Sequence, residues 1–388
     1  MSDLVLVHGG GPTAVINASL AGSVRELKEQ GFKGRLLAAR YGVRGIFNSD
    51  YADLTNLSGQ DLSRLEHTPG SAIGTGRDHL EDEDYEKLAA ELKAQGIGYV
   101  IMTGGNGTMD TCRRLAAVSA RHGITVTGTP KTMDNDLSVT DHSPGYGSYA
   151  RYLAASVKEA VADVEGLPIH AVVIEAFGRD AGWGTASSAL SRLHASSGPD
   201  IILPPELPFS EEAFLERVLE IHKEKGGLVI VASEGLRYED GTPIVEPVFK
   251  TDRSVYFGDV SSHLASLIVR RLGIKSRSEK PGILGRASIA WQSEVDVREA
   301  VECGRLSARA ALDGKSAFMS IIKRIPGKDY RSEVILSPIL DEILEARTMP
   351  EEFFDKDRLD VTEAFYGYAG PLTGDLGPDF ISFTRRNQ

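Results

Sequence analysis

The chain has 388 residues, of which 41% are hydrophobic and 25% charged; these ordinary globular proportions exclude a disordered or fibrous protein and leave room for two domains. Its 43 Lys and Arg residues against 55 Asp and Glu residues give a formal net charge of -12, which argues against nucleic acid or an anionic membrane as the main partner. Two cysteines, and no apolar run approaching about 18 residues, indicate a soluble protein of a reducing compartment, so we expect a cytoplasmic location.

Short apolar segments that lead into glycine recur along the chain, as expected of βα units. These segments are residues 4–7, 99–102, 172–174 and 228–231. Helical periodicity follows the first two of them, over 18–30 and 108–121, and the helices close at Gly31 and Gly123. Short strands that alternate with helices predict a doubly wound α/β fold with a mainly parallel sheet, whose ligands bind at the carboxyl ends of the strands.

Three glycine-rich segments are candidates for phosphate binding. Gly9–Ala14 stands between a strand and a helix, where glycine lets the backbone approach a phosphate and the helix N-terminus offers N–H groups. Gly104–Thr108 has the same context, so the two segments together suggest the two ends of a polyphosphate. Pro69–Arg77 adds hydroxyl groups and a guanidinium, which suits phosphate oxygens. Each segment by itself is also compatible with an ordinary tight turn.

The densest set of reactive side chains is Pro130–Asp136, directly after the strand-like residues 124–127. Asp134 and Asp136 can divide two tasks, because one carboxylate can accept a hydroxyl proton while the other helps to hold magnesium. Lys131 can neutralise charge on a transferring phosphoryl group. The alternative is an Asx-rich turn with solvated carboxylates. Two phosphate-loop candidates, an arginine loop and this cluster on consecutive strand ends favour phosphoryl transfer to an alcohol.

Six segments, in this order, resemble the phosphofructokinase family: GGGPTAVINASL, PGSAIGTGR, MTGGNGTMDT, PKTMDND, TDHSPGYGSYARY and EAFGRDAGW. The resemblance implies two similar doubly wound, mainly parallel α/β domains with the active site in the cleft between them. We expect a donor-phosphate domain at 1–145 with roughly 285–335, and a sugar-phosphate domain at 146–284 with 336–388. The implied reaction moves a phosphoryl group from ATP or pyrophosphate to the 1-hydroxyl of fructose 6-phosphate, with Mg2+, as in glycolysis.

The resemblance also assigns a role to each matching residue. Asp134 matches the general base, and the expected catalytic group is completed by Lys131, Thr132 and Arg179. The donor phosphates are expected on Gly10, Gly11, Arg77, Gly105, Asn106, Gly107 and Thr108. The sugar phosphate is expected on Asp136, Phe177, Gly178, Glu234, Arg277 and Arg286. The implied magnesium ligands are Asn106 and Asp136.

Several positions depart from the family pattern. Asn106 replaces the magnesium-linked Asp of ATP users, Ile283 replaces a hydrogen-bonding His or Tyr, and His170 replaces a cross-subunit Arg. Pyrophosphate users in this family typically combine an Asp in the second glycine loop with a Lys before the catalytic Thr, whereas this chain has Gly107 and Lys131. Because Gly107 leaves open the space of an α-phosphate and a nucleoside, we favour ATP as the donor.

Other assignments stay open. The residues of the segments GGGPTAVINASL and Gly-Arg-Asp-Ala-Gly-Trp resemble the pyrophosphate-dependent members of the family more closely, which favours a pyrophosphate-dependent enzyme. The altered pocket at Ile283, at Gly285 (which replaces a Gln of the family) and at His170 favours a kinase for another sugar or polyol. A non-catalytic regulator that binds a nucleotide or a sugar phosphate is a further alternative, against which Asp134 and Lys131 argue. The resemblance suggests a homodimer or homotetramer with small-molecule substrates, and neither nucleic acid nor a membrane as partner.

Overall fold

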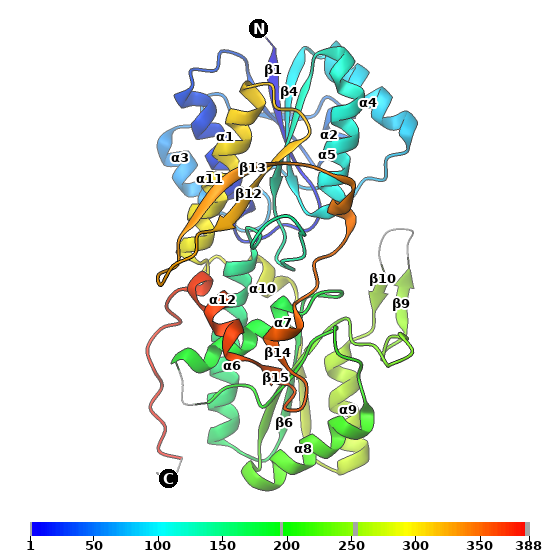
Figure 1. Cartoon of the computed structure of the whole chain (residues 1–388), viewed down its shortest axis with the longest axis vertical. Helices are drawn as coiled ribbons and strands as arrows, with labels where there is room; N and C mark the ends of the chain where they lie inside the picture. The colour runs from blue at the N-terminus through cyan, green and yellow to red at the C-terminus, as the bar shows by residue number, and fades with distance from the viewer. Residues whose placement is uncertain (1, 195–196, 251–254, 385–388) are drawn as a thin grey trace. The chain divides into compact units, whose positions relative to one another are not determined.

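The computed structural model describes residues 2–194, 197–250 and 255–384, which form two compact units (Figure 1). Unit 1 runs to Ser148 and takes up the chain again over Arg286–Arg347; unit 2 comprises Tyr149–Gly285 and the residues from Thr348 onward. The expected domain boundary at 335 falls within a strand of unit 1. Residues 336–347 therefore belong to unit 1 and not, as expected, to the sugar-phosphate domain.

Unit 1 is built on a seven-stranded sheet with the order β13-β12-β5-β4-β1-β2-β3. The strands are β1 (Asp3–His8), β2 (Leu36–Ala39), β3 (Tyr51–Asp53), β4 (Ile97–Gly104), β5 (Thr125–Pro130), β12 (Phe318–Arg324) and β13 (Ser332–Pro338). The five inner strands are parallel, and β3 and β13 pair antiparallel at the two edges. Because β13 pairs with β12 from Ser332 to Pro338, the chain stays in unit 1 beyond residue 335.

Helices cover both faces of this sheet (Figure 1). They are α1 (Ile16–Glu29), α2 (Val43–Phe47), α3 (Gly59–Glu66), α4 (Asp82–Ala94), α5 (Asn106–Ser119) and α11 (Glu294–Leu312), with the 3-10 turns η1 (Ala120–His122) and η3 (Asp341–Leu344). Alternate residues of β1 point to opposite faces. Leu4 and Leu6 pack with residues of α1 and α11, whereas Val5 and Val7 pack with residues of α4 and α5.

The pair α1 and α11 lies unusually close, because two glycines face backbone at their contact. A Cβ on Gly22 would lie 2.1 Å from the carbonyl oxygen of Val301, and one on Gly304 would lie 2.0 Å from that of Ser19. The hydroxyl of Ser23 donates to the carbonyl oxygen of Gly304 over 3.0 Å. This contact fixes α1, the helix that follows the first glycine turn, against α11.

Unit 2 has a four-stranded parallel sheet with the order β11-β6-β8-β7. Its strands are β6 (Ala171–Ala176), β7 (Ile201–Leu203), β8 (Leu228–Ser233) and β11 (Ser276–Glu279), beside the two-stranded pairs β9 (Pro247–Lys250) with β10 (Val255–Phe257) and β14 (Phe354–Asp355) with β15 (Asp360–Val361). Its helices are α7 (Trp183–Ser187), α8 (Glu211–Lys225), α9 (Val260–Leu272) and α12 (Glu363–Thr373), with η2 (Ser188–His194) and η4 (Glu351–Phe353). Two further helices run across unit boundaries, α6 (Tyr146–Gly166) and α10 (Ile283–Ala287).

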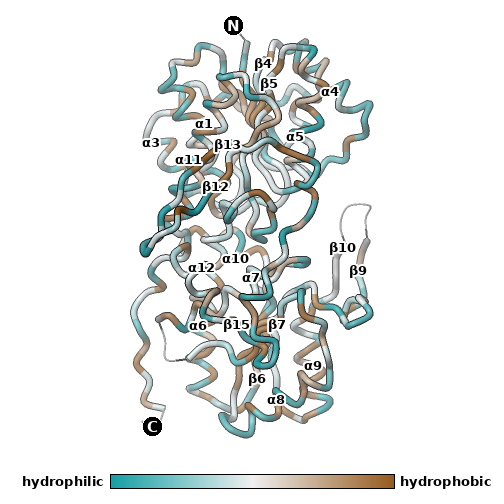
Figure 2. The backbone as a smooth tube through the Cα atoms, in the orientation of Figure 1, coloured by the Kyte–Doolittle hydropathy of each residue, from teal (hydrophilic) through white to brown (hydrophobic). Residues whose placement is uncertain are grey.

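The core of unit 2 is built like that of unit 1, from helices that pack on a mainly parallel sheet. The strands β6, β7 and β8 are buried along their whole length, as expected of parallel strands, and Figure 2 shows hydrophobic residues along β6 and β7. Val173 and Ile230 pack with Phe214 and Val218 of α8 and with Leu264 of α9. The predicted doubly wound α/β fold with mainly parallel sheets is thus confirmed in both units. No helix in the described part of the chain combines the length and apolar character needed to span a membrane.

Candidate functional site

The polar segments singled out in the sequence follow three neighbouring strands of unit 1. The strands β1, β4 and β5 lie side by side and parallel, so their carboxyl ends at His8, Gly104 and Pro130 share one edge of the sheet. The turn from Gly9, the helix start at Gly105 and the loop from Lys131 leave from that edge, as predicted.

The first glycine turn is packed too tightly for any larger residue. Gly10 has φ +76°, and a Cβ on Gly9 would lie 2.3 Å from Oγ1 of Thr108. The backbone N–H groups of Gly9 and Gly10 donate to the carbonyl oxygens of Thr103 and Gly76, both over 2.9 Å. The amides of Gly9 and Gly10 are therefore engaged by the protein itself. Phosphate binding at Gly10 and Gly11 stays a prediction.

The arginine loop is anchored to unit 1 by two buried side chains at the start of the chain. Nδ2 of Asn17 donates to the carbonyl oxygens of Thr68 and Gly70 over 2.8 and 3.1 Å, and Oδ1 of Asn17 accepts from the N–H of Ala72 over 2.9 Å. Nδ1 of His8 lies 2.8 Å from the hydroxyl of Ser71. These anchors bring Arg77 to the glycine turn, where its Nη2 lies 3.6 Å from the position of a Cβ on Gly11.

Three cationic side chains meet at the glycine turn, and we call Arg77, Lys131 and Arg286 the cation group. Nζ of Lys131 donates to the carbonyl oxygen of Gly11 over 2.6 Å, and Nη1 of Arg286 lies 2.7 Å from the position of a Cβ on Gly11. The Lys131 side chain is buried, with 4% of the residue exposed. Burial lowers the pKa of Lys131 to about 8; Asp134 and Asp136 oppose this shift, and Arg286 and Arg77 add to it. The group concentrates positive charge at a partly dehydrated site.

Asp134 and Asp136 lie on the same loop as Lys131 and in range of its charge. Both carboxylates raise the pKa of Lys131, so both act on its ammonium electrostatically. The N–H of Asp134 donates to the hydroxyl of Thr132 over 3.1 Å. Between the two aspartates, Asn135 is fully buried with φ +57°, a left-handed conformation that places its neighbours on a sharp bend. The structure therefore brings Lys131, Thr132, Asp134 and Asp136 together, as predicted.

The second glycine loop meets the carboxylate loop through Asn106. Gly105 is the N-cap of α5, and Nδ2 of Asn106 donates to Oδ2 of Asp136 over 3.1 Å. Oδ1 of Asn106 is buried and accepts no hydrogen bond from the described residues. Thr108 packs beneath the strand ends, because its hydroxyl oxygen lies 2.2 Å from the position of a Cβ on Gly104. Around Gly107, by contrast, a Cβ would meet nothing within 4 Å.

The predicted sugar-side residues of unit 2 gather at the carboxyl ends of β6 and β8. The N–H of Phe177 donates to the hydroxyl of Tyr149 over 2.8 Å, and the hydroxyl of Ser233 donates to the carbonyl oxygen of Gly178 over 2.7 Å. Burial raises the pKa of Glu234, although the charge of Arg179 opposes the shift. Phe177, Gly178, Arg179 and Glu234 are thus neighbours.

Two predicted sugar-phosphate arginines lie elsewhere. Arg277 is paired in register with Val172, near the start of β6, and its side chain is exposed, so it stands apart from Arg179 and Glu234. Arg286 is in unit 1 and belongs to the cation group at Gly11. The resemblance implied sugar-phosphate contacts for Arg277 and Arg286, and those contacts stay a prediction. Arg277 is the second residue of β11, which is parallel to β6, so it lies toward the amino ends of these strands.

Several residues that shape this region were not found from the sequence. His8 is buried, and burial followed by the charge of Lys131 lowers its pKa to about 3, so its imidazole is neutral. The carboxylate of Asp296, on α11, accepts from the N–H groups of Gly145 and Ser148, both over 2.8 Å, and so holds the start of α6. Only the position of His8 next to the glycine turn was a local signal; Asp296 is about 150 residues from its partners.

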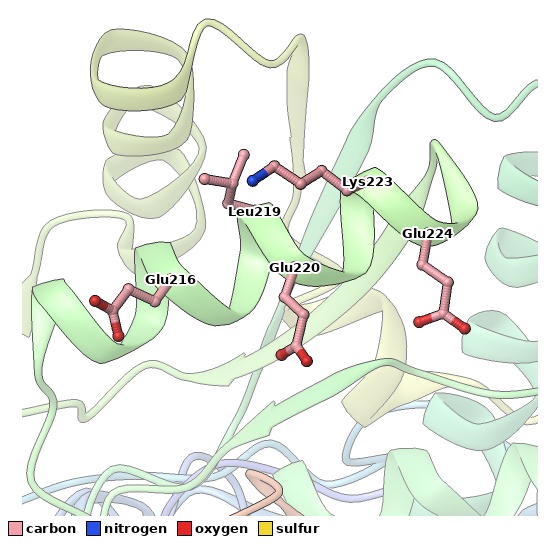
Figure 3. Close-up of a pocket in the computed structure, with 5 residues that line it drawn as sticks. All are labelled: Glu216, Leu219, Glu220, Lys223 and Glu224. Atoms are coloured by element: carbon pink, nitrogen blue, oxygen red, sulfur yellow. The ribbon is translucent and has the colours of Figure 1, made fainter.

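A shallow depression on α8 of unit 2 is a weaker candidate. It is lined by Glu216, Leu219, Glu220, Lys223 and Glu224, all from the one helix (Figure 3). The three carboxylates spread along the helix in Figure 3 instead of converging, and the charged residues are exposed. This arrangement is that of a solvated helix face.

Comparisons with known proteins bear on the chemistry of the strand-end site. Residues 3–312 match the family model described as Phosphofructokinase. A pyrophosphate–fructose 6-phosphate 1-phosphotransferase of Halomonas elongata is 36% identical over 97% of this chain and 92% of that protein. The protein of the same name from Xanthomonas campestris is 34% identical, with the same coverage of 97% and 92%. The crystal structure of a pyrophosphate-dependent phosphofructokinase from Marinobacter aquaeolei aligns with a TM-score of 0.87 and 32% identity over 99% of this chain and 94% of that chain.

Proposed function

Because this chain belongs to the phosphofructokinase family and is a phosphotransferase with an alcohol acceptor, we propose that it transfers a phosphoryl group from pyrophosphate to the 1-hydroxyl of fructose 6-phosphate. The relatives described above carry pyrophosphate in their names, which favours pyrophosphate over ATP. The sequence-based preference for ATP rested on Gly107, whose open surroundings permit a nucleoside and do not require one. The products of the proposed reaction are fructose 1,6-bisphosphate and inorganic phosphate.

The observation that carries this proposal is the cation group beside Gly10 and Gly11. The positive charges of Arg77, Lys131 and Arg286 meet beside one turn, at Gly11. Pyrophosphate is a compact anion, and such a group neutralises its charge. Arginine offers pairs of parallel donors to phosphate oxygens, and the buried ammonium of Lys131 acts as a point charge. The donor phosphates are therefore proposed to bind side chains more than the amides of the turn.

Asp134 is the proposed general base. Its carboxylate lies in electrostatic range of Lys131, so it can accept the proton of the acceptor hydroxyl beside the charge that binds the donor. Thr132, whose hydroxyl accepts the N–H of Asp134, supports the bend that carries the base. On the acceptor we propose Arg179 and Glu234 of unit 2, because a buried glutamate next to a guanidinium suits sugar hydroxyls and a phosphate.

Magnesium is the proposed cofactor, and the side chains of Asn106 and Asp136 fit it. The buried Oδ1 of Asn106 is an acceptor without a hydrogen-bond donor among the described residues, and Asp136 is 3.1 Å from its amide nitrogen. No three His, Cys, Asp or Glu side chains of the described residues gather into a metal-binding group, and magnesium requires only one or two protein oxygens with substrate phosphates. Bound there, it would neutralise phosphate charge. Asn106→Leu should raise the Mg2+ concentration for half-maximal rate; an unchanged value would exclude Asn106 as a ligand.

Initial rates with each donor test the proposal. With Mg2+ and fructose 6-phosphate, we expect kcat/KM for pyrophosphate to exceed that for ATP by at least tenfold, or about 1.4 kcal/mol. Equal or better use of ATP would overturn the donor assignment. Turnover of an unphosphorylated sugar or polyol, with none of fructose 6-phosphate, would overturn the acceptor assignment.

A further inference from the structure

The loop that carries Asp134 and Asp136 is held from the C-terminal part of unit 1 by one arginine. Nη1 of Arg347 donates to the carbonyl oxygens of Thr140 and Asp141 over 2.8 and 2.6 Å. Nη2 of Arg347 donates to the carbonyl oxygen of Asn135 over 3.0 Å. The backbone N–H of Arg347 donates to the carbonyl oxygen of Asp136 over 2.8 Å. One residue therefore satisfies four carbonyl groups within a seven-residue stretch of the loop.

Arg347 is itself fixed in place by the packing of the segment before it. Ala346 forms a β-bridge with Leu137, and Leu137 is fully buried in the same hydrophobic cluster as Ile343. The backbone before Arg347 is thus anchored, and the guanidinium extends from it to the loop. A planar fork with several donors can hold carbonyl groups that point in different directions, which a lysine ammonium on a flexible stem does less well.

The need for such a clamp arises from the conformation of the loop. Asn135 is held at φ +57°, a left-handed conformation that is uncommon for non-glycine residues, although asparagine tolerates it better than most. Its side-chain Oδ1 accepts from the N–H of Ser143 over 3.0 Å, and Arg347 holds its carbonyl oxygen on the other side. The carbonyl group that follows, on Asp136, is held by the backbone of Arg347.

We propose that Arg347 is a positioning residue, which fixes the loop backbone so that the carboxylates of Asp134 and Asp136 keep their places relative to Lys131. The inference deepens the proposed function and rests on it for its rate measurement. Displacement of a catalytic group by about 1 Å can cost on the order of 10²-fold in rate. Loss of the clamp should therefore lower kcat and leave the donor-binding residues Gly11 and Arg77 in place.

The test compares Arg347→Ala with a matched arginine that holds carboxylates far from the loop. Arg305 pairs with Glu26 over 3.0 Å and with Glu29, and Arg305→Ala should keep the wild-type kcat even if its Tm falls. We expect Arg347→Ala to lower kcat about 10²-fold with KM for pyrophosphate within about threefold. Added guanidinium at millimolar concentration should restore part of kcat in Arg347→Ala and none in Arg305→Ala.

Amide hydrogen exchange over residues 133–142 supplies a readout that needs no turnover. Exchange should accelerate there in Arg347→Ala and stay unchanged in Arg305→Ala. A wild-type kcat, no rescue by guanidinium, or unchanged exchange in Arg347→Ala would overturn the inference. If the wild-type protein transfers no phosphoryl group from pyrophosphate, the proposed function fails, and the exchange experiment alone decides on Arg347.

Discussion

The ammonium of Lys131 donates a hydrogen bond to the carbonyl oxygen of Gly11 over 2.6 Å, which joins the loop after β5 to the turn after β1. This contact places the expected donor site and the expected base on adjoining pieces of backbone, although more than a hundred residues separate them in the chain. The lowered pKa of Lys131 has a separate cause, because the ammonium is buried and lies near the guanidinium groups of Arg286 and Arg77.

The charge of Lys131 predicts how activity depends on pH. Burial holds the pKa of Lys131 at about 8, so the ammonium that we propose binds the donor loses its proton as pH rises through that value. We expect kcat/KM for pyrophosphate to fall above about pH 8, by up to tenfold per pH unit. Initial rates at saturating Mg2+ from pH 6.5 to 9.5 measure this.

The matched variants are Lys131→Met and Lys158→Met. Lys158 is also buried and also donates to a carbonyl oxygen, that of Pro378, over 2.7 Å. Lys131→Met should lower kcat/KM about 10²-fold and abolish the fall above pH 8, whereas Lys158→Met should keep the wild-type profile. A fall at the same pH in Lys131→Met would assign it to another group.

The position of Arg286 predicts which substrate it binds. Because its guanidinium lies with Arg77 at Gly11, Arg286→Gln should raise KM for pyrophosphate by about 10–100-fold, as expected for loss of charged hydrogen bonds of about 1.5–3 kcal/mol. Arg298, which is exposed on α11, gives the control Arg298→Gln, with unchanged constants expected. A rise in KM for fructose 6-phosphate alone would return Arg286 to the sugar phosphate, where the sequence resemblance put it.

A buried charge network predicts how stability depends on pH. Burial by itself would lower the pKa of His142, but hydrogen bonds to Asp141 and Glu299, over 2.8 and 2.7 Å, raise it to about 9. A folded-state pKa above the ordinary 6.5 means that the folded protein binds this proton more tightly. The resulting stability is complete below about pH 6.5 and is lost as pH rises to about 9.

Urea unfolding at pH 6, 7.5 and 9 measures this effect. The free energy of unfolding of the wild-type protein should fall over this range, and that of His142→Gln should be lower at pH 6 and fall less. His79→Gln is the control, because His79 is exposed beside Glu81. Parallel curves for the wild type and His142→Gln would contradict the assignment of the proton to His142.

The sequence predicted those features that depend on neighbouring residues. The strands before Gly9, Gly104 and Gly178, and the helices after the first two of these glycines, follow from apolar runs and glycine punctuation, which are local signals. The strand-end cluster from Lys131 to Asp136 followed from the parallel fold itself. These predictions succeeded because the chemistry and the turn lie within a few residues of each other.

The remaining features depend on contacts between distant parts of the chain. Asp296 holds the start of α6 from about 150 residues away, and Arg347 holds the carboxylate loop from more than 200 residues away. The neighbours of Asp296 and Arg347 in the sequence give no sign of these contacts. The placement of 336–347 in unit 1 depends on the pairing of β13 with β12, and that of Arg286 on how its helix meets Gly11. Periodicity and composition carry no information on such pairings.

The most direct test of the whole account is the rate of Asp134→Asn. This variant keeps the size of the side chain and removes the carboxylate that we propose accepts the hydroxyl proton. We therefore predict a fall in kcat of about 10²–10⁴-fold with KM for pyrophosphate within a few-fold. Asp313→Asn, at the exposed end of α11, should match the wild type. A kcat of Asp134→Asn within a few-fold of the wild-type value would contradict the role of Asp134 as the base.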